Sequence, residues 1–184
     1  MTVVISMLRG INVGSHNRIT MDALSALYRS LGLREPQTYV QSGNVVFTTG
    51  ERNLVKLGKA IETGIERRFG FRSQVILRTT SDLRDVVARN PFAKRRDIEF
   101  GKLLVTFLAT DPGLEARNQI LDIKADPEEV RLSGRELYIY FPNGMGRSKL
   151  PAQLEKILKK SGTARNWNTV SKLLEIAERL ESCG

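Results

Sequence analysis

The sequence has few of the residues that build metal centres and disulfide frameworks. Its 184 residues include one cysteine, Cys183, and one histidine, His16. A single cysteine excludes an internal disulfide, and one cysteine with one histidine excludes a Cys/His cluster for zinc. We therefore expect no metal site and no cofactor. This cysteine usage is typical of a reducing compartment, so we expect a cytoplasmic location.

Long hydrophobic runs are also missing. The apolar stretch near the N-terminus ends at Arg9 and is far shorter than the roughly 20 residues that span a bilayer. The same stretch lacks the basic segment and the small-residue cleavage site of a secretory signal. We expect no membrane partner. Hydrophobic residues still make up 41% of the chain, enough for a packed core in one large domain or two small ones.

Acidic residues are outnumbered by basic ones. The chain has 29 Lys and Arg against 20 Asp and Glu, which gives a formal net charge of +9. Such an excess favours a polyanionic partner, because Lys and Arg neutralise phosphates and release counterions. The basic residues are scattered and form no long tail, so the charge also fits a surface that only keeps a small protein soluble. Composition leaves both interpretations open.

The order of the predicted elements repeats along the chain. In the first half, strand-like and helix-like patterns predict a strand at 3–8, a helix at 20–32, a hairpin around Ser42-Gly43, a helix at about 52–69 that Gly70 ends, and a strand at 74–79. In the second half they predict a strand at 102–109, a helix after Asp111-Pro112, a hairpin around Ser133-Gly134, a helix capped by Ser148 and a short strand at TARNW. Both halves read β-α-β-β-α-β, the split-βαβ, ferredoxin-like arrangement.

The sequence therefore predicts an α+β fold of two tandem ferredoxin-like halves with antiparallel sheets, followed by a C-terminal helix. We expect the first half at 1–80, a helix and charged connector at 81–100, and the second half with the terminal helix at 101–184. Asn168 is the expected N-cap of that last helix. The first strand has no polar side, so we expect its sheet to be covered on both faces, by the other half or by the terminal helix.

The segment RGINVGSHNRI, residues 9–19, is the first candidate binding loop. Gly10 and Gly14 permit positive φ and close backbone approach, and exposed N–H groups there can form an anion nest. Arg9 and Arg18 can fork onto a phosphate or a carboxylate. The segment matches neither the dinucleotide fingerprint nor the P-loop. The alternative is a rigid loop whose asparagine side chains satisfy its own backbone.

The segment PNGMGRSKLP, residues 142–151, is the second candidate. Two glycines lead into a helix start, with Arg147 and Lys149 beside it. Backbone N–H groups at a helix N-terminus, together with two cations, can hold an anion. The alternative is a turn-rich connection in which Ser148 is a plain N-cap.

The segment TARNWNTV, residues 163–170, is the third candidate. It combines Arg165, two asparagines and the only tryptophan, Trp167. A tryptophan beside an arginine can stack a nucleobase or hold another ring. Equally, Trp167 can be a core aromatic, with Asn168 only a helix cap.

Catalytic arrangements are scarce. His16 could act as a general base, but spacing ties no carboxylate or serine partner to it. The chain has no G-x-S-x-G elbow and no carboxylate-rich metal motif. Proteins with an RNA-recognition sheet carry aromatics on its first and third strands, and here the corresponding runs hold only Phe47. The sequence alone leaves open whether the protein is an enzyme.

The motifs RGINVG, QSGNVVF, NPF at 90–92, PNGMGRSKL and TARNWNTV occur in this order in a family of bacterial proteins, domain of unknown function 1697, and the chain resembles a full-length member. The resemblance implies two ferredoxin-like halves and brings no activity, substrate or cofactor. The family's usual opening has Gly and Lys where this chain has Ser15 and His16. If that lysine touches an anion in relatives, the contact is weakened or pH-dependent here.

These patterns favour a binding protein with an anion-accepting cleft between its halves, for nucleic acid or a phosphorylated small molecule. An enzyme acting on a small anionic substrate at the same cleft is the alternative. In a third hypothesis, a structural or interaction protein, the motif residues only fix turns. The predicted ligand-binding residues are Arg9, Gly10, Asn12, Gly14, His16, Asn17, Gln41, Asn44, Lys149, Arg165, Asn166 and Trp167.

Overall fold

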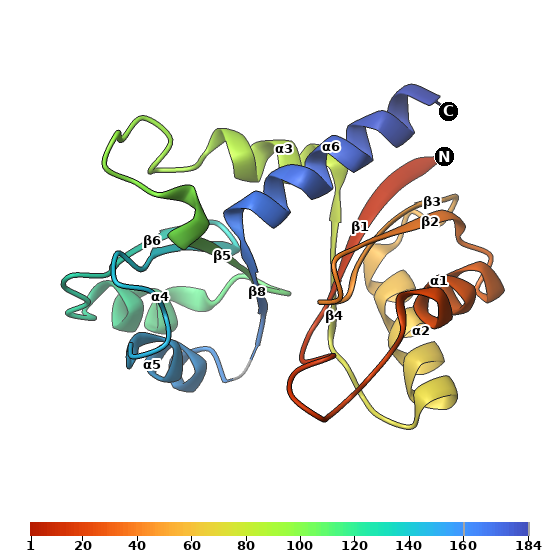
Figure 1. The fold of residues 1–184 in the computed structure, drawn as a ribbon, viewed down its shortest axis with the longest axis horizontal. Helices are drawn as coiled ribbons and strands as arrows, with labels where there is room; N and C mark the ends of the chain where they lie inside the picture. The colour runs from red at the N-terminus through yellow and green to blue at the C-terminus, as the bar shows by residue number, and fades with distance from the viewer. Residues whose placement is uncertain (160, 184) are drawn as a thin grey trace. The chain divides into compact units, whose positions relative to one another are not determined.

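The computed structural model describes residues 1–159 and 161–183. The chain divides into two compact units, which we call unit 1 and unit 2 and describe separately. Unit 1 comprises Met1–Asp85 and Ser171–Gly184, and unit 2 comprises Val86–Val170. The sequence-based ranges 1–80, 81–100 and 101–184 stay a prediction. Figure 1 labels most of the helices and strands.

Unit 1 is built on a four-stranded antiparallel sheet with the strand order β2-β3-β1-β4. Its elements are β1 (Thr2–Leu8), α1 (Met21–Ser30), β2 (Arg34–Tyr39), β3 (Asn44–Thr49), α2 (Leu54–Phe69), β4 (Val75–Thr79) and the start of α3 (Thr80–Ala88). Every residue of β1 from Val3 onward is buried, as its apolar sequence predicts for a central strand. The order of elements is the predicted β-α-β-β-α-β.

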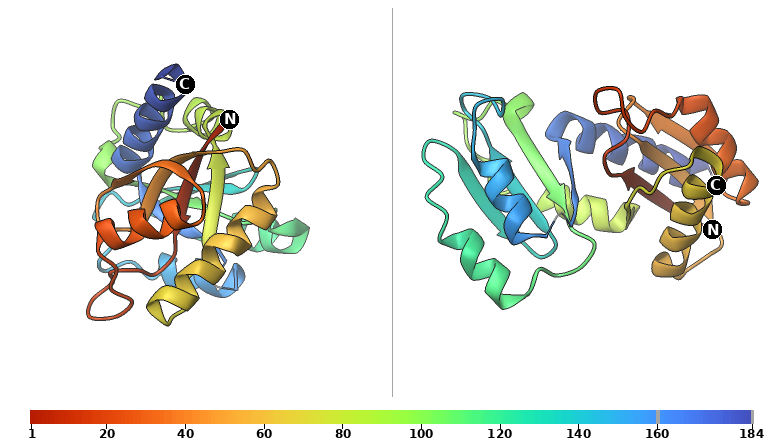
Figure 2. Two further views of the ribbon diagram at one scale, coloured as in Figure 1. Left: turned by 90° about the vertical axis from the view of Figure 1, so that its right-hand side faces the viewer. Right: turned by 90° about the horizontal axis from the view of Figure 1, so that it is seen from below.

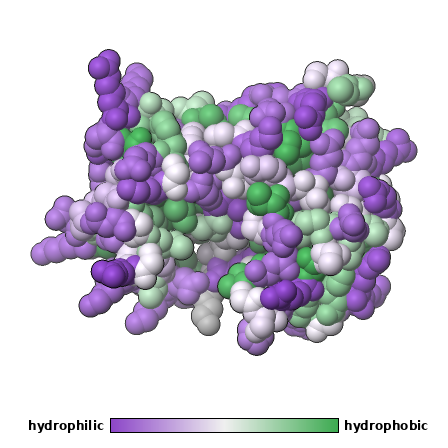
Figure 3. Space-filling model, viewed as in Figure 1, coloured by the Kyte–Doolittle hydropathy of each residue, from purple (hydrophilic) through white to green (hydrophobic). Residues whose placement is uncertain are grey.

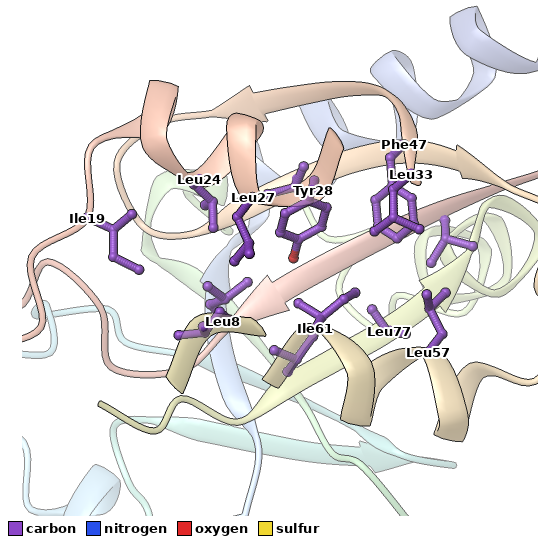
Figure 4. Packing of buried hydrophobic residues seen from close by; sticks show 14 of the residues in the cluster. Leu8, Ile19, Leu24, Leu27, Tyr28, Leu33, Phe47, Leu57, Ile61 and Leu77 are labelled. Atoms are coloured by element: carbon purple, nitrogen blue, oxygen red, sulfur yellow. The ribbon is translucent and has the colours of Figure 1, made fainter. Parts of the chain in front are cut away.

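One face of this sheet carries both α1 and α2, as the left view of Figure 2 shows. Because side chains alternate along a strand, every second residue meets these helices. Figure 4 shows the resulting core, in which Leu8 and Phe47 from the sheet lie close to Tyr28 from α1 and Ile61 from α2. The Tyr28 hydroxyl is hydrogen-bonded to the Ser6 hydroxyl at 2.6 Å, so the buried polar pair is satisfied. Burial raises the pKa of Tyr28 well above its usual range.

The opposite face of the sheet in unit 1 is also buried. Ile5 and Val46 point to that face and have no exposed surface. Part of α6 (Trp167–Cys183) belongs to unit 1, where Arg179 donates from Nη2 to the Gln37 side chain on β2 at 3.0 Å. In the same unit Arg84 of α3 forms ion pairs with two glutamates of α6. The terminal helix is thus a cover of this face, one of the two covers expected.

Unit 2 repeats the topology, with the strand order β6-β7-β5-β8. Its elements are the 3-10 helix η1 (Phe100–Lys102), β5 (Leu103–Phe107), α4 (Gly113–Leu121), β6 (Glu129–Ser133), β7 (Glu136–Tyr140), α5 (Leu150–Ile157) and β8 (Thr163–Asn166). The two units are therefore tandem ferredoxin-like halves with antiparallel sheets, and the fold prediction is confirmed (Figure 1).

The core of unit 2 has a helix-facing side and a side closed by the segment that precedes β5. On the first side, a cluster that includes Leu137 and Ile139 of β7 packs against Leu154 of α5. On the second side, Tyr138 donates its hydroxyl proton to the Val86 carbonyl at 2.7 Å. Phe92, from the NPF motif, is buried there with its ring centroid 6.2 Å from that of Tyr140. The motif phenylalanine is therefore a core residue.

The start of the last helix differs from the prediction. Asn168 was expected to be the N-cap, but α6 begins at Trp167. The Asn166 side chain accepts a hydrogen bond from the Asn168 backbone N–H at 2.9 Å, which is the geometry of a cap two residues upstream. The prediction was wrong because β8 continues into α6 without a loop. Two asparagines flank the tryptophan, and spacing alone could not identify which one caps.

Candidate functional site

The loop at residues 9–19 is held by its own asparagines. The Asn12 side chain donates to the Ile19 carbonyl at 3.0 Å, accepts from the Ile19 N–H at 2.9 Å and donates to the Gln41 carbonyl at 2.8 Å. Asn17 donates to the Gly10 carbonyl at 3.1 Å. Four residues of the loop have positive φ: Gly10, Asn12, Gly14 and Asn17. The amide side chains thus support backbone that glycine and asparagine adopt more readily than other residues.

The turn that joins β2 to β3 is fastened to this loop. The Leu8 N–H donates to the Gly43 carbonyl at 2.9 Å, and Gln41 receives the bond from Asn12. Asn44 is buried, and its amide donates to the Tyr39 carbonyl and to the Ser42 hydroxyl. The predicted residues of unit 1 therefore gather at one end of its sheet. For Asn12, Asn17 and Asn44, the contacts described are those of a rigid turn.

The charged side chains of the loop differ in exposure. Arg9 is half-buried, with its backbone N–H bound to Gln74 and its carbonyl accepting from the Ser73 hydroxyl at 2.8 Å. Arg18 is exposed and donates to the Gly14 carbonyl at 3.3 Å. His16 is exposed, and in the described part of the chain no carboxylate or hydroxyl is paired with its ring. The loop thus offers Arg18 and His16 to solvent.

Arg165 of unit 2 lies inside the protein. Its side chain is 7% exposed, and its Nη1 donates to the Thr163 hydroxyl at 2.7 Å and to the Ala164 carbonyl at 2.8 Å. Burial disfavours the charged form, so the pKa of Arg165 falls to about 10. These contacts fix the guanidinium against its own strand. A ligand contact of Arg165 stays a prediction.

Arg78 is the counterpart of Arg165 in unit 1, and sequence reasoning missed it. It is 1% exposed and donates from Nη1 to the Leu77 carbonyl at 2.9 Å. Arg78 is paired with Ile5 on β1, as Arg165 is paired with Val105 on β5. Each arginine lies two residues before a helix that continues its strand directly. The available signal was an arginine directly after the apolar residues VIL, at the position in the first half that matches Arg165 in the second.

Trp167 packs against an aromatic ring that the sequence did not single out. Its ring stacks on Phe100 of η1, with centroids 6.1 Å apart and planes inclined by 30°. The Asn166 side chain donates to the Gly101 carbonyl at 2.7 Å, which fastens η1 to the junction of β8 and α6. Trp167 is half-buried, whereas Phe100 is 37% exposed. No local motif marks Phe100, because its partner lies 67 residues further along the chain.

The loop at 142–151 reaches the same end of the sheet of unit 2. The Phe141 N–H at the end of β7 donates to the Lys102 carbonyl of η1 at 3.0 Å. Ser148 accepts from the Leu150 N–H at 3.1 Å, and Lys149 precedes α5 without a side-chain cap bond. Arg147 and Lys149 are exposed. The second candidate segment therefore starts at the end of the sheet of unit 2 at which β8 and the third candidate segment lead into α6.

Two cavities of unit 2 lie away from these residues. One of about 470 Å³ lies between the start of α4 and the end of α5, and one of about 640 Å³ lies beside the edge strand β6. Neither is lined by a predicted binding residue. On the face in Figure 3 the surface is mainly hydrophilic, with hydrophobic residues in small separate groups.

Two searches of the described residues were negative. Across residues 1–159 and 161–183, no group of three His, Cys, Asp or Glu side chains is arranged to hold a metal ion. In the same residues, no helix has the length and apolar character needed to cross a membrane.

Comparison with known proteins identifies a family and a similar fold. A family model described as "Protein of unknown function (DUF1697)" matches residues 1–138. No curated protein matches the chain. Among solved structures, the chain is similar to the conserved bacterial protein SP0830 from Streptococcus pneumoniae, with 22% identity and a TM-score of 0.74. That match covers 96% of this chain and 98% of the other, and at this identity it supports the fold alone.

Proposed function

Since this chain belongs to DUF1697, a family whose description assigns no activity, we propose from its own residues that it is a cytoplasmic protein that binds a phosphate-bearing anion. Nucleic acid is the ligand that its surface supports best. A phosphorylated small molecule is the second candidate. The observation that carries the proposal is a set of exposed arginine and lysine side chains that form no ion pair with any residue that the structure describes.

Ion pairing separates two classes of basic residue in this protein. Several cations are neutralised locally, such as Lys56, whose Nζ lies 2.8 Å from a carboxylate oxygen of Glu51. Other cations are exposed and have no carboxylate within 4.0 Å among the described residues. They include Arg18, Arg29 and Arg34 in unit 1, and Arg96, Arg147 and Lys149 in unit 2. The positive charge of the second class is available to a ligand.

The distribution of the unpaired cations favours a polymer over a small molecule. Within unit 1 they lie on a loop, on α1 and on β2, and within unit 2 they lie on loops. A small phosphorylated ligand needs cations that converge on one concave site. A nucleic acid gains affinity from cations spread over a surface, because each neutralised phosphate releases counterions.

Binding of a fluorescently labelled ten-nucleotide DNA single strand, measured by anisotropy from 50 to 300 mM salt, tests this proposal. We expect binding at low salt that weakens steeply, with log K falling by about 0.7 per phosphate contact for each unit of log salt. A parallel titration with nucleoside monophosphates examines the second candidate. Absence of binding at 50 mM salt, or binding that salt does not change, contradicts the nucleic-acid proposal.

Substitutions that each remove one positive charge identify the residues that contact phosphate. Arg18→Ala, Arg147→Ala and Lys149→Ala each remove one unpaired cation, and a phosphate-contacting residue is expected to lower the salt slope by about one contact. Lys56→Ala is the matched control, because it changes the net charge equally but removes a cation already neutralised by Glu51. If Lys56→Ala weakens binding as much as the other three, only net charge matters and the proposed contacts are wrong.

A further inference from the structure

We infer that the aromatic pair Phe100–Trp167 is a stacking site for a nucleobase of single-stranded nucleic acid. This inference rests on the proposed anion binding and assigns it a place in unit 2 and a ligand class. An aromatic ring in a protein ordinarily buries its apolar faces. Phe100 instead stacks on Trp167 and still remains 37% exposed.

The pair is held rigidly before any ligand arrives. Trp167 is the first residue of the 17-residue helix α6, and Asn166 caps that helix. The same Asn166 side chain donates to the Gly101 carbonyl, so the segment that carries Phe100 is fixed to the segment that carries Trp167. A site whose geometry is already set loses little side-chain entropy on binding.

Two exposed residues beside the pair offer polar groups to a ligand. Gly101, next to Phe100, is exposed, and apart from its two chain neighbours a Cβ placed on it would meet the Asn168 side-chain nitrogen at 4.0 Å. Asn168 is itself exposed, so its amide is available to the edge of a base. The backbone at Gly101 can therefore be approached closely.

A loop with exposed cations starts at the same end of the sheet. The bond from the Phe141 N–H to the Lys102 carbonyl joins the start of the 142–149 loop to η1, and that loop carries the exposed and unpaired Arg147 and Lys149. Proteins that bind single-stranded nucleic acid combine aromatic rings with a positively charged surface. The bases stack on the rings, and the cations contact the phosphates of the backbone. Sequence tolerance is expected, since every base has a stacking face.

The site is also distinct from the sheet-face platform of RNA-recognition domains. In unit 1, the strand residues that face away from α1 and α2, such as Ile5 and Val46, are buried and aliphatic. In unit 2, the aromatic residue Tyr138 on the corresponding side is buried and bonded to Val86. The Phe100–Trp167 pair lies instead at the end of the sheet of unit 2.

Fluorescence of Trp167, the only tryptophan of the chain, reports directly on this site. We expect a ten-nucleotide thymidine strand to quench it, and an abasic strand of equal length and charge to leave it unchanged. The anisotropy of the two labelled strands, recorded in parallel, reports anion binding. Quenching by thymidine monophosphate alone would assign the site to free nucleotides and overturn the single-strand assignment.

Variants separate stacking from folding. Phe100→Ala is expected to weaken thymidine-strand binding roughly five- to a hundred-fold, the range for the loss of one stacked base, and Phe100→Leu to weaken it nearly as much because the π-face is lost. Leu114→Ala, which also trims an exposed apolar side chain of unit 2, is the control and is expected to leave binding unchanged. Thermal unfolding of each variant verifies the fold.

The outcomes distinguish the two proposals. If the thymidine strand and the abasic strand bind with equal affinity and Trp167 fluorescence does not change, the stacking proposal is wrong while the anion-binding proposal stands. If neither strand binds, the proposed function itself fails. Equal affinity of Phe100→Ala and the unaltered protein for the thymidine strand would also overturn the inference.

Discussion

Gly43, the glycine of the QSGN motif, offers a sharp test of how the first candidate loop is built. Its φ is +79°, a left-handed conformation that costs an alanine about 1–2 kcal/mol. A Cβ at this position would lie 2.7 Å from Ile11 Cδ1 and 2.8 Å from Leu8 Cβ. The isoleucine end can rotate, but Leu8 Cβ is attached to the backbone of the central strand β1, so the crowding must move backbone.

Overpacking of this kind costs about 1–3 kcal/mol, so Gly43→Ala is expected to lower the free energy of unfolding by about 2–5 kcal/mol in total. Gly32→Ala separates the two contributions. Gly32 has a φ of +76°, yet nothing lies within 4 Å of a Cβ built there. Gly32→Ala is therefore expected to lower the free energy of unfolding only by the contribution of the left-handed backbone conformation, about 1–2 kcal/mol.

Urea unfolding followed by circular dichroism measures both variants, with equal m-values as the condition for comparing midpoints. We expect the free energy of unfolding of Gly43→Ala to be lower than that of Gly32→Ala by about 1–3 kcal/mol. Equal losses of stability in the two variants would show that the turn at Gly43 accommodates the added methyl group without an energetic penalty. The tight joint between the 9–19 loop and the β2-β3 turn would then be refuted.

Three further predictions concern polar side chains. Asn12→Asp keeps the bond to the Ile19 N–H but cannot donate to two carbonyls, so we expect urea unfolding to show a loss of about 1–3 kcal/mol; an unchanged midpoint would contradict the anchoring role. Asn166→Ala is expected to lower the free energy of unfolding by about 0.5–2 kcal/mol, and Asn168→Ala by less than about 0.5 kcal/mol. A larger loss for Asn168→Ala than for Asn166→Ala would identify Asn168 as the cap. The Arg117 guanidinium and the Gly113 N–H hold the pKa of Asp111 below its usual range. We therefore expect the unaltered protein to have a larger free energy of unfolding than Asp111→Asn above about pH 4, and this difference to be lost as pH falls through the lowered pKa of Asp111. If unfolding measured over an acid titration shows a difference that persists at low pH, the pairing of Asp111 with Arg117 is refuted.

Local patterns were sufficient to predict the fold. The continuously apolar VVISML predicted a central strand, and β1 is buried from Val3 to Leu8. Thr20 was expected to cap the first helix, and its hydroxyl accepts from the Ala23 N–H at 3.2 Å. These features depend on neighbours within a few residues, which is the range over which periodicity and capping act.

The candidate site depended on pairings that spacing does not encode. Asn12 is bonded to the Gln41 carbonyl across 29 residues, and Phe100 meets Trp167 across 67, so neither contact has a signature in the sequence around it. Arg165 was predicted as a ligand cation from its polar neighbours, yet it is buried. Which side of a short strand faces the interior follows from its register with β5, and register is set by tertiary packing.

The most direct test of the central claim is a nuclear magnetic resonance titration of the isotopically labelled protein with a ten-nucleotide thymidine strand at 50 mM salt. We expect shifts of the single Trp167 indole N–H, of the Phe100 and Gly101 amides and of the 142–149 loop, and we expect these shifts to disappear at 300 mM salt as phosphate contacts are screened. Shifts confined to the residues that line the cavities beside α4 and β6, with the indole signal unmoved, would contradict it.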